Sequence, residues 1–342
     1  MRKIIFFCAI ISLVLSACGQ GSSDGDIVSK SNFQLDTVVT ISLYGSDDEL
    51  IIDDAFDEIE RFEQLLSRKR SGSDPDILAK SGGEGFVPVS RDTIFLLTEG
   101  EKFSKLTGGL FDLSIGPLVS LWDISGGGYF PKDEERLQAM DLVNYEDILI
   151  NNDEVMLKNE GMEVDLGAVA KGYIADNLKS FMIQKGVKSG IINLGGDIVL
   201  IGGKPGGDSF NIGVQDPCGA TGESMGVLEI SDRALVSSGT YERFFIYDGR
   251  TYHHIIDPKT GFPAENGLLQ VTVVADDAMT GDVLSTSAFL LGLEKGIRLV
   301  DETVGASAIF ITNDKKVWLS SGFNETFYII DDEYSLEGEL TL

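Results

Sequence analysis

Apolar and polar residues follow two different periods in the first half of the chain. Strict alternation along Phe33–Tyr44 predicts a β-strand, and apolar residues at helical spacing along Leu50–Leu66, with acids between them, predict an amphipathic helix. A second helix is expected from an N-cap at Ser90 to about Leu106, and a third across Gly167–Lys185. Strands and helices are therefore interspersed from the start.

Short apolar stretches separated by Gly, Asp and Pro dominate the second half. Their spacing predicts antiparallel strands at Ile191–Leu194, Ile198–Ile201, Phe210–Val214, Val227–Ile230 and Phe244–Tyr247. The last third repeats the order of the opening, with a strand at Leu268–Ala275, a helix at Met279–Leu291, and strands near Ala308–Thr312 and Val317–Ser320. No short-period repeat occurs, which excludes solenoids and propellers. The fold class is α+β, with mostly antiparallel sheets and packed helices.

The N-terminus has the features of a secretion signal. Arg2 and Lys3 precede the apolar run Ile4–Leu15, which is short for a membrane span, so residues 1–17 are predicted to be a signal peptide. Cys18 follows Leu-Ser-Ala, as in a bacterial lipobox, and this predicts a lipoprotein with lipid on Cys18. The alternative is a signal peptide with an incidental cysteine.

The residues after the signal predict a membrane tether. Residues 18–32 are poor in apolar side chains and rich in Gly, Ser and Asp, so we expect a lipidated cysteine followed by a flexible tether. Residues 33–342 form the predicted folded domain. The predicted location is the outer face of the bacterial cytoplasmic membrane, or the periplasm, with a lipid anchor.

Composition removes several classes of function. The chain has 342 residues, and its 27 Lys and Arg against 55 Asp and Glu give a formal charge of −28, which excludes a nucleic-acid partner. The only two histidines, His253 and His254, are adjacent, so no metal site can be built from histidines scattered along the chain. Cys218 is the only thiol expected in the mature domain, which leaves no intramolecular disulfide.

Two glycine-rich segments suit the close approach of a ligand. Asp165-Leu-Gly-Ala-Val-Ala-Lys-Gly-Tyr173 places an acid, a turn and Lys171 at an expected helix N-terminus, where free N–H groups favour a phosphate. The alternative is a glycine needed for tight packing beside a lysine that extends to solvent. The glycines of Asn193-Leu-Gly-Gly-Asp197 follow an apolar strand and indicate close approach of a neighbouring strand or a ligand.

Two other groups suit proton transfer and metal binding. Neighbouring residues on a strand point to opposite faces, so only one of His253 and His254 is expected to face a site, although a lone histidine is usually structural. Asp282 and Thr286 lie four apart in a predicted helix, so their oxygens share a face and suit Mg²⁺. The alternative for Asp282 is capping of the helix N-terminus.

Taken together, seven segments resemble the ApbE family of FAD:protein FMN transferases over almost the whole mature chain. In order, they are Leu35-Asp36-Thr37, Gly109-Leu110-Phe111-Asp112 with Pro117-Leu118, Asp165 to Tyr173, Asn193 to Asp197, Ser238-Gly239-Thr-Tyr241-Glu242, His254 to Gly261, and Asp282 to Thr286. The resemblance implies a duplicated, T-fold-like architecture. It also implies transfer of the FMN moiety of FAD to a Thr or Ser hydroxyl of a target protein through a phosphoester bond, with AMP as the leaving group.

The resemblance further assigns roles to residues. It implies that Mg²⁺ is the cofactor, held by Asp282, the hydroxyl of Thr286 and the backbone oxygen of Ala168. His254 is implied to be the base for the acceptor hydroxyl, with Asp282 as the second catalytic residue. The implied FAD contacts are Leu35, Leu110, Phe111, Asp112, Asp165, Lys171, His254 and Ile255. The implied acceptors are subunits of membrane electron-transfer complexes such as Rnf or the Na⁺-pumping NADH:quinone oxidoreductase.

Two positions depart from the pattern of the family. Leu35-Asp36-Thr37 replaces an opening that commonly reads Met-Gly-Thr, and Lys69 stands two residues after Ser67, where many members place an aromatic beside the flavin. Loss of that stacking partner leaves a second hypothesis open, a Mg²⁺-dependent FAD pyrophosphatase that gives FMN and AMP. A third hypothesis is a non-catalytic lipoprotein that binds FAD.

Overall fold

The computed structural model describes residues 27–46 and 48–339, and its largest element is a nine-stranded sheet. In the order in which they pair, the strands are β1 (Ile27–Gln34), β2 (Thr37–Tyr44), β6 (Gly190–Leu194), β7 (Asp197–Ile201), β10 (Ala234–Gly239), β15 (Leu268–Ala275), β16 (Ala306–Thr312), β17 (Lys316–Leu319) and β19 (Ser335–Glu339). Neighbours run antiparallel except β17 and β19, which are parallel. The predicted α+β class is confirmed.

The sheet consists of two halves with the same chain order. In the first half, β1 and β2 precede the helices α1 (Glu49–Leu66) and α6 (Ala170–Gln184), and β6 and β7 follow them. In the second half, β10 and β15 precede α7 (Ala278–Leu291) and α8 (Leu293–Asp301), and β16 and β17 follow. This order explains why the last third of the sequence resembles the opening, and it confirms the duplicated architecture.

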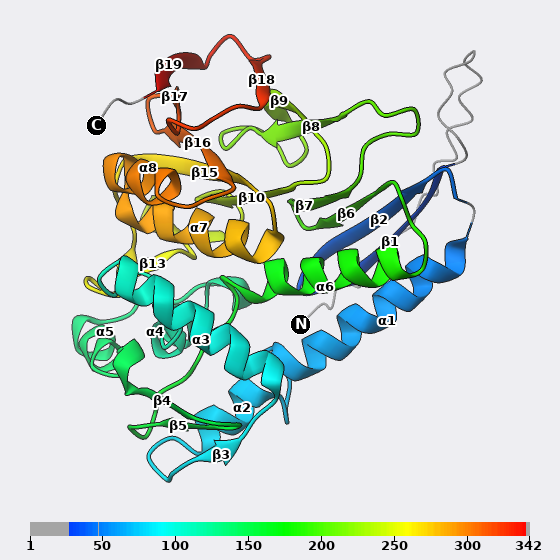
Figure 1. Ribbon diagram of the computed structural model, residues 1–342. Helices are drawn as coiled ribbons and strands as arrows, with labels where there is room; N and C mark the ends of the chain where they lie inside the picture. The colour runs from blue at the N-terminus through cyan, green and yellow to red at the C-terminus, as the bar shows by residue number, and fades with distance from the viewer. Residues whose placement is uncertain (1–26, 47, 340–342) are drawn as a thin grey trace, which may run out of the picture.

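Both faces of the nine-stranded sheet are covered. Helices α1, α6, α7 and α8 pack on one face, and a three-stranded sheet of β8 (Phe210–Gln215), β9 (Ser224–Ile230) and β18 (Thr326–Ile329) packs on the other (Figure 1). In β15, Val273 belongs to the core under the helices, whereas the next residue, Val274, belongs to the core under the small sheet. A strand buried on both faces loses the alternation of polar and apolar residues, as this one does.

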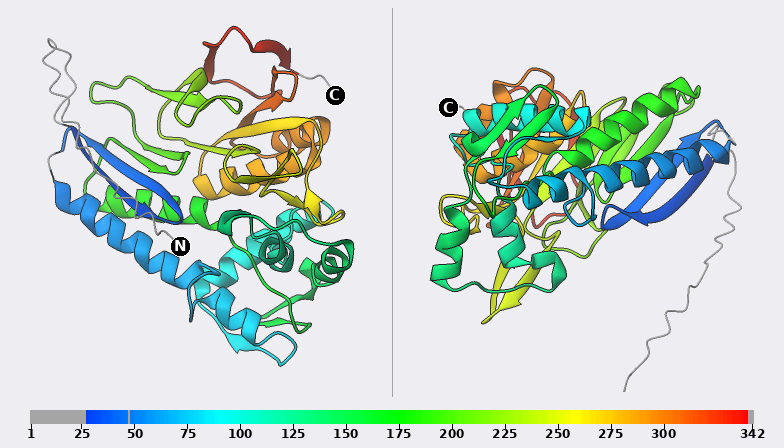
Figure 2. Two further views of the ribbon diagram at one scale, coloured as in Figure 1. Left: turned by 180° about the vertical axis from the view of Figure 1, so that it is seen from behind. Right: turned by 90° about the horizontal axis from the view of Figure 1, so that it is seen from below.

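Each half of the chain carries an insertion, and the two insertions pack together (Figures 1 and 2). The first contains α2 (Asp74–Lys80), β3 (Val87–Pro88), α3 (Arg91–Leu106), α4 (Gly116–Trp122), η1 (Ile124–Gly126), α5 (Asp133–Met140), η2 (Tyr145–Asp147), β4 (Ile148–Asn151) and β5 (Glu154–Leu157). The second contains the hairpin of β11 (Phe244–Tyr247) and β12 (Arg250–His253), and the pair β13 (Ile256–Asp257) and β14 (Phe262–Pro263). Trp122 and Tyr252 lie in the small core between them.

The opening strand is different from the prediction. The alternating segment Phe33–Tyr44 is broken at Leu35 and Asp36, which form a two-residue turn with φ of 55° and 57°, so β1 and β2 are a hairpin. The pattern concealed this turn because Leu is rare at positive φ and turns of this type favour Asn-Gly. The prediction of a flexible tether over residues 18–32 is wrong for residues 27–32, which belong to β1; Cys18 and residues 1–26 lie outside the described part of the chain.

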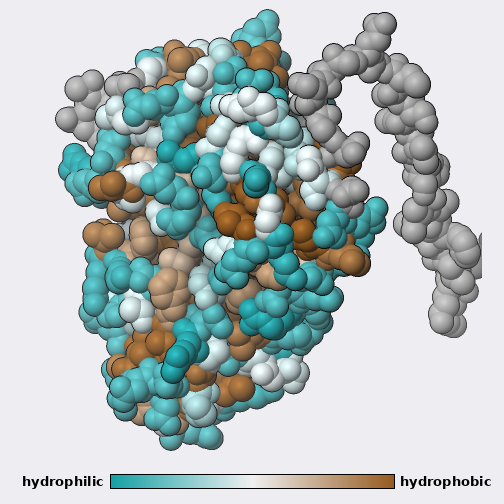
Figure 3. All heavy atoms as spheres, turned by 45° about the vertical axis from the view of Figure 1, so that its right-hand side comes forward, coloured by the Kyte–Doolittle hydropathy of each residue, from teal (hydrophilic) through white to brown (hydrophobic). Residues whose placement is uncertain are grey.

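The helix predictions hold with small shifts of the ends. Ser90 caps α3, and its hydroxyl accepts from the N–H of Thr93 at 3.1 Å. The helix predicted across Gly167–Lys185 begins only at Ala170, because Val169, with φ −148° and ψ −27°, lies outside the helical conformation. In the described ranges, no helix combines the length and apolar character needed to cross a bilayer. On the face shown in Figure 3, hydrophilic side chains are interspersed with hydrophobic groups, the largest of which lies right of centre.

The two hairpin turns offer a matched test of the strain at Asp36. The β11–β12 turn places Gly249 at φ 75°, the equivalent second position to Asp36 in the β1–β2 turn. Asp36→Gly should raise the free energy of unfolding by about 0.5–1 kcal/mol, because glycine adopts positive φ without a side-chain clash. Gly249→Asp should lower it by a similar amount. Chemical denaturation measures both, and a loss of stability in Asp36→Gly would contradict strain at this turn.

Candidate functional site

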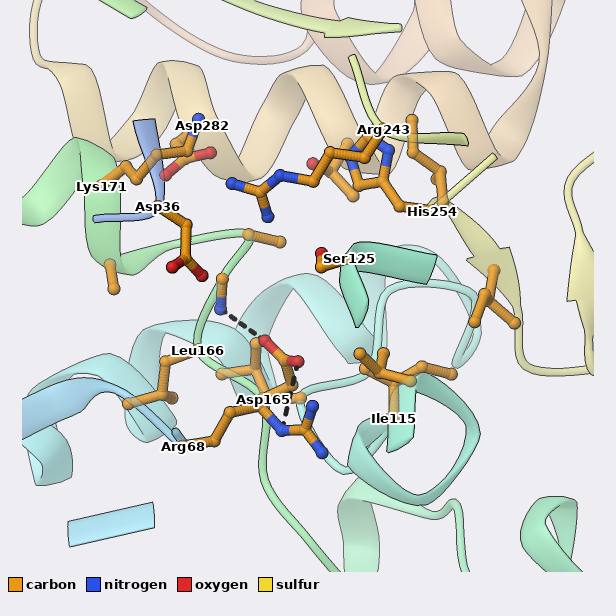
Figure 4. A pocket seen from close by; sticks show the side chains of 18 of the residues that line it. Asp36, Arg68, Ile115, Ser125, Asp165, Leu166, Lys171, Arg243, His254 and Asp282 are labelled. Carbon is orange, nitrogen blue, oxygen red and sulfur yellow. Dashed lines mark hydrogen bonds and ion pairs between the residues drawn. The ribbon is translucent and has the colours of Figure 1, made fainter. Parts of the chain in front are cut away.

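A cavity of about 290 Å³ lies between α6, α7 and the two insertions. All eleven residues singled out from the sequence as catalytic, FAD-binding or metal-binding line it: Leu35, Leu110, Phe111, Asp112, Asp165, Ala168, Lys171, His254, Ile255, Asp282 and Thr286. In Figure 4, Lys171 and Asp282 lie at the upper left of the cavity, His254 lies at the upper right, and Asp165 lies below them, across the cavity. The structure therefore gathers residues from both halves of the chain in one place.

The metal-binding prediction centres on the crossing of α6 and α7. Asp282 is only 4% exposed, and its Oδ2 accepts from the N–H of Gly172 at 2.9 Å. This N–H is one of the first in α6, which begins at Ala170, and such groups have no partner within their own helix; Asp282 therefore satisfies it from α7. Asp282 does not cap its own helix, because that role belongs to Asp277, which accepts from the N–H of Thr280.

A second hydrogen-bonded contact fixes the same crossing from the other side. The carboxylate of Asp176 in α6 accepts from the N–H groups of Ala278 at 2.8 Å and Met279 at 2.9 Å, at the N-terminus of α7. Each helix thus offers a carboxylate to backbone N–H groups near the start of the other. The separation and rotation of α6 and α7, and with them the position of Asp282, are set by these bonds.

Negative charge outweighs positive charge at this wall. Lys171 forms an ion pair with Asp197, and Asp282 and Glu242 lie near it. Burial alone would lower the pKa of Lys171, but these three carboxylates hold it above its ordinary value, so the ammonium is charged. Burial raises the pKa of Asp282; Lys171 opposes this rise and Asp197 adds to it. A further cation would relieve the excess of buried negative charge.

The residues present fit Mg²⁺ as that cation. Asp282, Thr286 and Ala168 bring a carboxylate, a hydroxyl and a backbone carbonyl to the cavity, and Mg²⁺ prefers such oxygen donors. Across residues 27–46 and 48–339, no group of three or more His, Cys, Asp or Glu is arranged to hold a metal. One carboxylate, one hydroxyl and one carbonyl make a small donor set, which suits a cation that takes few protein ligands and completes its shell with water and substrate phosphates.

Only one of the two histidines faces the cavity, as predicted. His253 is buried: its Nδ1 accepts from the N–H of Ile255, so its Nε2 donates to the carbonyl of Ala264 at 3.0 Å. His254 lines the cavity, its Nε2 lies 4.0 Å from Glu242, and its Nδ1 has no hydrogen-bond partner among the described residues. Burial, and then the charge of Arg243, hold the pKa of His254 well below its usual range. The imidazole is therefore neutral, the form in which one ring nitrogen has a free lone pair.

Two of the acids predicted to contact FAD are also held by the protein itself. Oδ1 of Asp165 accepts from the N–H of Gly167 at 2.7 Å, and its Oδ2 lies 3.6 Å from Nε of Arg68 (Figure 4). The carboxylate of Asp112 accepts from Ser114, through both N–H and hydroxyl, and from the N–H of Tyr145. Asp112 therefore shapes its loop, which leaves little of the carboxylate for a ligand.

The structure also explains the close approach predicted at the glycine segment and shows the position of Lys69. Gly195 is where a strand approaches closely, because a Cβ there would lie 2.2 Å from the side chain of Thr37. Lys69 lies at the edge of the cavity and pairs with Asp36 at 2.6 Å, both about half exposed. Sequence reasoning gave no role to Arg68 or Arg243, although each adjoins a segment that it quoted.

Comparisons with known proteins agree along most of the chain. A model of the ApbE family matches residues 35–310. The FAD:protein FMN transferase of Klebsiella pneumoniae is 35% identical over 317 residues, which cover 92% of this chain and 98% of the relative. That of Treponema pallidum is 31% identical over 361 residues, which cover 98% and 100%. The crystal structure of the ApbE protein of Thermotoga maritima is 30% identical, with a TM-score of 0.80, and covers 86% of this chain and 97% of that one.

The two roles of Asp282 can be separated by two substitutions. Asp282→Asn keeps an oxygen for the N–H of Gly172 but removes the charge, whereas Asp282→Ala removes both. We expect Mg²⁺ to raise the melting temperature of the unaltered protein but of neither variant. Without Mg²⁺, Asp282→Ala should be less stable than Asp282→Asn by about 1 kcal/mol, because a buried N–H loses its partner. An undiminished Mg²⁺ effect in Asp282→Asn would rule out this carboxylate as a ligand.

Proposed function

The chain belongs to the ApbE family, and we propose that it transfers the FMN moiety of FAD to a Thr or Ser hydroxyl of an acceptor protein, with Mg²⁺ as cofactor. The observation that carries the proposal is the meeting of eleven predicted residues, from segments far apart in the chain, at one cavity. The transferase names of its relatives support it. FAD without its FMN moiety is AMP, so AMP is the second product.

The chemistry needs positioned groups rather than a covalent intermediate on the protein. The hydroxyl oxygen of the acceptor attacks the phosphorus of the FMN phosphate, and the bond from that phosphorus to the bridging oxygen breaks. The bridging oxygen leaves with the electron pair as part of AMP, and the hydroxyl proton passes to a base. Neutral His254, which lines the cavity, is in the right form to accept it.

The other residues hold and neutralise the substrate. Lys171, whose charge is kept by its three acidic neighbours, offers a cation to the phosphates near the start of α6. Asp282, Thr286 and Ala168 would hold Mg²⁺, which when bound neutralises charge on the phosphate oxygens. The loop that Asp112 orders, with Leu110 and Phe111, forms the apolar part of the cavity on the side of the first insertion.

A specific observation supports the pyrophosphatase as the second candidate. Lys69 and Asp36 form a half-exposed ion pair at the edge of the cavity, in the place where an aromatic residue would cover a flavin and exclude water. If water reaches the phosphorus in place of the acceptor hydroxyl, the products are FMN and AMP. The two reactions share every residue named above and differ only in the attacking oxygen.

A single assay separates these candidates. Residues 27–342 are incubated with FAD and Mg²⁺, with and without a threonine-bearing flavin-acceptor domain, while AMP and the mass of the acceptor are measured. We expect AMP together with a mass gain equal to FMN on the acceptor. AMP without a mass gain would identify the pyrophosphatase, and neither product would leave a protein that only binds FAD. His254→Ala should lower the rate by about 10²-fold or more, because a general base is removed.

We propose a lipid-anchored position on the outer face of the cytoplasmic membrane, or in the periplasm, with acceptor subunits of Rnf-like or Nqr-like complexes as partners. The signal-like residues 1–17 and Cys18 support it. Only residues 19–26 separate Cys18 from β1, and a chain of this length spans at most about 28 Å. The domain would therefore act close to the membrane, where subunits of membrane complexes lie.

The anchor has its own test. In a bacterial host, the chain should sediment with membranes and carry a diacylglyceryl group on an N-terminal Cys18, as seen by mass spectrometry of the mature protein. Cys18→Ser should release it into the soluble fraction, since the thioether can no longer form. Cys218→Ser is the control, because this cysteine belongs to the folded domain. Membrane association that survives in Cys18→Ser would contradict the anchor.

A further inference from the structure

Four cationic side chains line the cavity, and three of them are engaged with acids of the protein. The three ion pairs are Arg68 with Glu163 at 2.7 Å, Lys69 with Asp36 at 2.6 Å, and Lys171 with Asp197. The fourth cation, Arg243, forms no ion pair, and its side chain makes no hydrogen bond, with any residue in the described ranges. Its guanidinium is thus the one cation of the cavity whose five N–H groups are all available to a ligand.

The hairpin of β11 and β12 fixes where Arg243 points. The N–H of His254 donates to the carbonyl of Arg243 at 3.1 Å, so the two residues face each other at the base of the hairpin. Two residues after Arg243, Phe245 packs into the small core against Trp122. Figure 4 shows the guanidinium extended from this base across the cavity, toward the side where Asp36, Lys171 and Asp282 lie.

The surroundings of Arg243 make an unused guanidinium there unexpected. Seven acids line the cavity against four cations: Asp36, Glu63, Asp112, Asp123, Asp165, Glu242 and Asp282. The charge of Arg243 lowers the pKa values of Asp36, Glu242 and His254. Among the described residues, however, no carboxylate forms an ion pair with it, as Asp36 does with Lys69 and Asp197 does with Lys171. A cation that forms no ion pair within an acidic cavity is available to bind an anionic ligand.

We propose that Arg243 binds the pyrophosphate of FAD, a role that rests on the proposed function. An acidic cavity repels a substrate with two negative phosphates unless cations offset the wall. Arg243 has a planar fork of N–H donors that matches two phosphate oxygens at once. Because the bond between the FMN phosphorus and the bridging oxygen breaks, negative charge grows on the AMP phosphate, and Arg243 stabilises it as AMP leaves.

Ligands with and without phosphates test this contact directly. Flavin fluorescence measures the binding of FAD and of riboflavin, first in EDTA and then in Mg²⁺. Riboflavin has the same ring system as FAD but no phosphate. Arg243→Met should weaken FAD binding by about 10- to 100-fold, the loss of a charge-assisted contact, and leave riboflavin binding unchanged. Arg243→Lys should lie between, because it keeps the charge but not the fork.

A matched control lies on the same hairpin. Arg250→Met removes an equal charge from β12, but Arg250 pairs with Glu265 at the surface and does not line the cavity. It should bind both ligands as the unaltered protein does. Thermal melts of all variants show whether the hairpin is intact, and if Arg243→Met unfolds early, the same comparison is made with Arg243→Lys.

Each result decides the proposal. A selective loss of FAD binding supports it. Equal losses for FAD and riboflavin, or no loss for either, would overturn it while leaving the transferase assay of the unaltered protein unaffected. If the unaltered protein bound no FAD and released no AMP, the proposed function and the role of Arg243 would fall together.

Discussion

The close contact of α6 with α7 at Gly172 is the constraint on which the cavity depends. A Cβ at Gly172 would lie 2.3 Å from the carbonyl oxygen of Ala278, so only glycine lets the two backbones approach this far. At that distance the carboxylates of Asp282 and Asp176 reach N–H groups of the opposite helix. Since α6 belongs to the first half of the duplicated sheet and α7 to the second, one contact joins the halves and builds the wall of the site.

The same contact explains why charge accumulates there. Bringing the helices together buries Asp282 near Lys171 and Asp197, and the carboxylates outnumber the ammonium. Such an arrangement is costly by itself, because each buried charge has lost its water. The proposed divalent cation and the anionic phosphates of FAD would reduce this cost if they entered together, since each would offset the charge of the other and of the wall. A protein of charge −28 can in this way suit an anionic dinucleotide.

Local patterns in the sequence predicted what is local in the structure. The helical spacing of Leu50–Leu66 and the cap at Ser90 report on contacts within one element, and both were confirmed. The turn at Leu35 and Asp36 was missed because its conformation is imposed by pairing of the flanking strands and not by residues that favour it. The start of α6 at Ala170 was missed because its N-cap, Val169, is not a residue type that favours this position, and the N–H of Gly172 is satisfied by Asp282, more than a hundred residues later.

The sequence predicted which residues line the cavity, but not which partners their side chains have there. Motifs located Asp112 in the cavity, but only the structure shows that its carboxylate is occupied by Ser114 and Tyr145. Arg243 was missed for the opposite reason. Its side chain has no ion-pair or hydrogen-bond partner among the described residues, and this depends on the fold and cannot be read from the sequence.

The two walls of the cavity are built on different principles. The wall with Lys171 and Asp282 belongs to helices packed on the main sheet, where burial keeps geometry rigid. The wall with His254 belongs to a hairpin outside that sheet, held by the stacking of Tyr252 on Trp122 and by the indole N–H of Trp122 on the carbonyl of Gly261 at 2.8 Å. The group proposed to take the proton from the acceptor thus lies beside a hairpin outside the main sheet, while the groups proposed to hold the substrate lie on helices packed against that sheet.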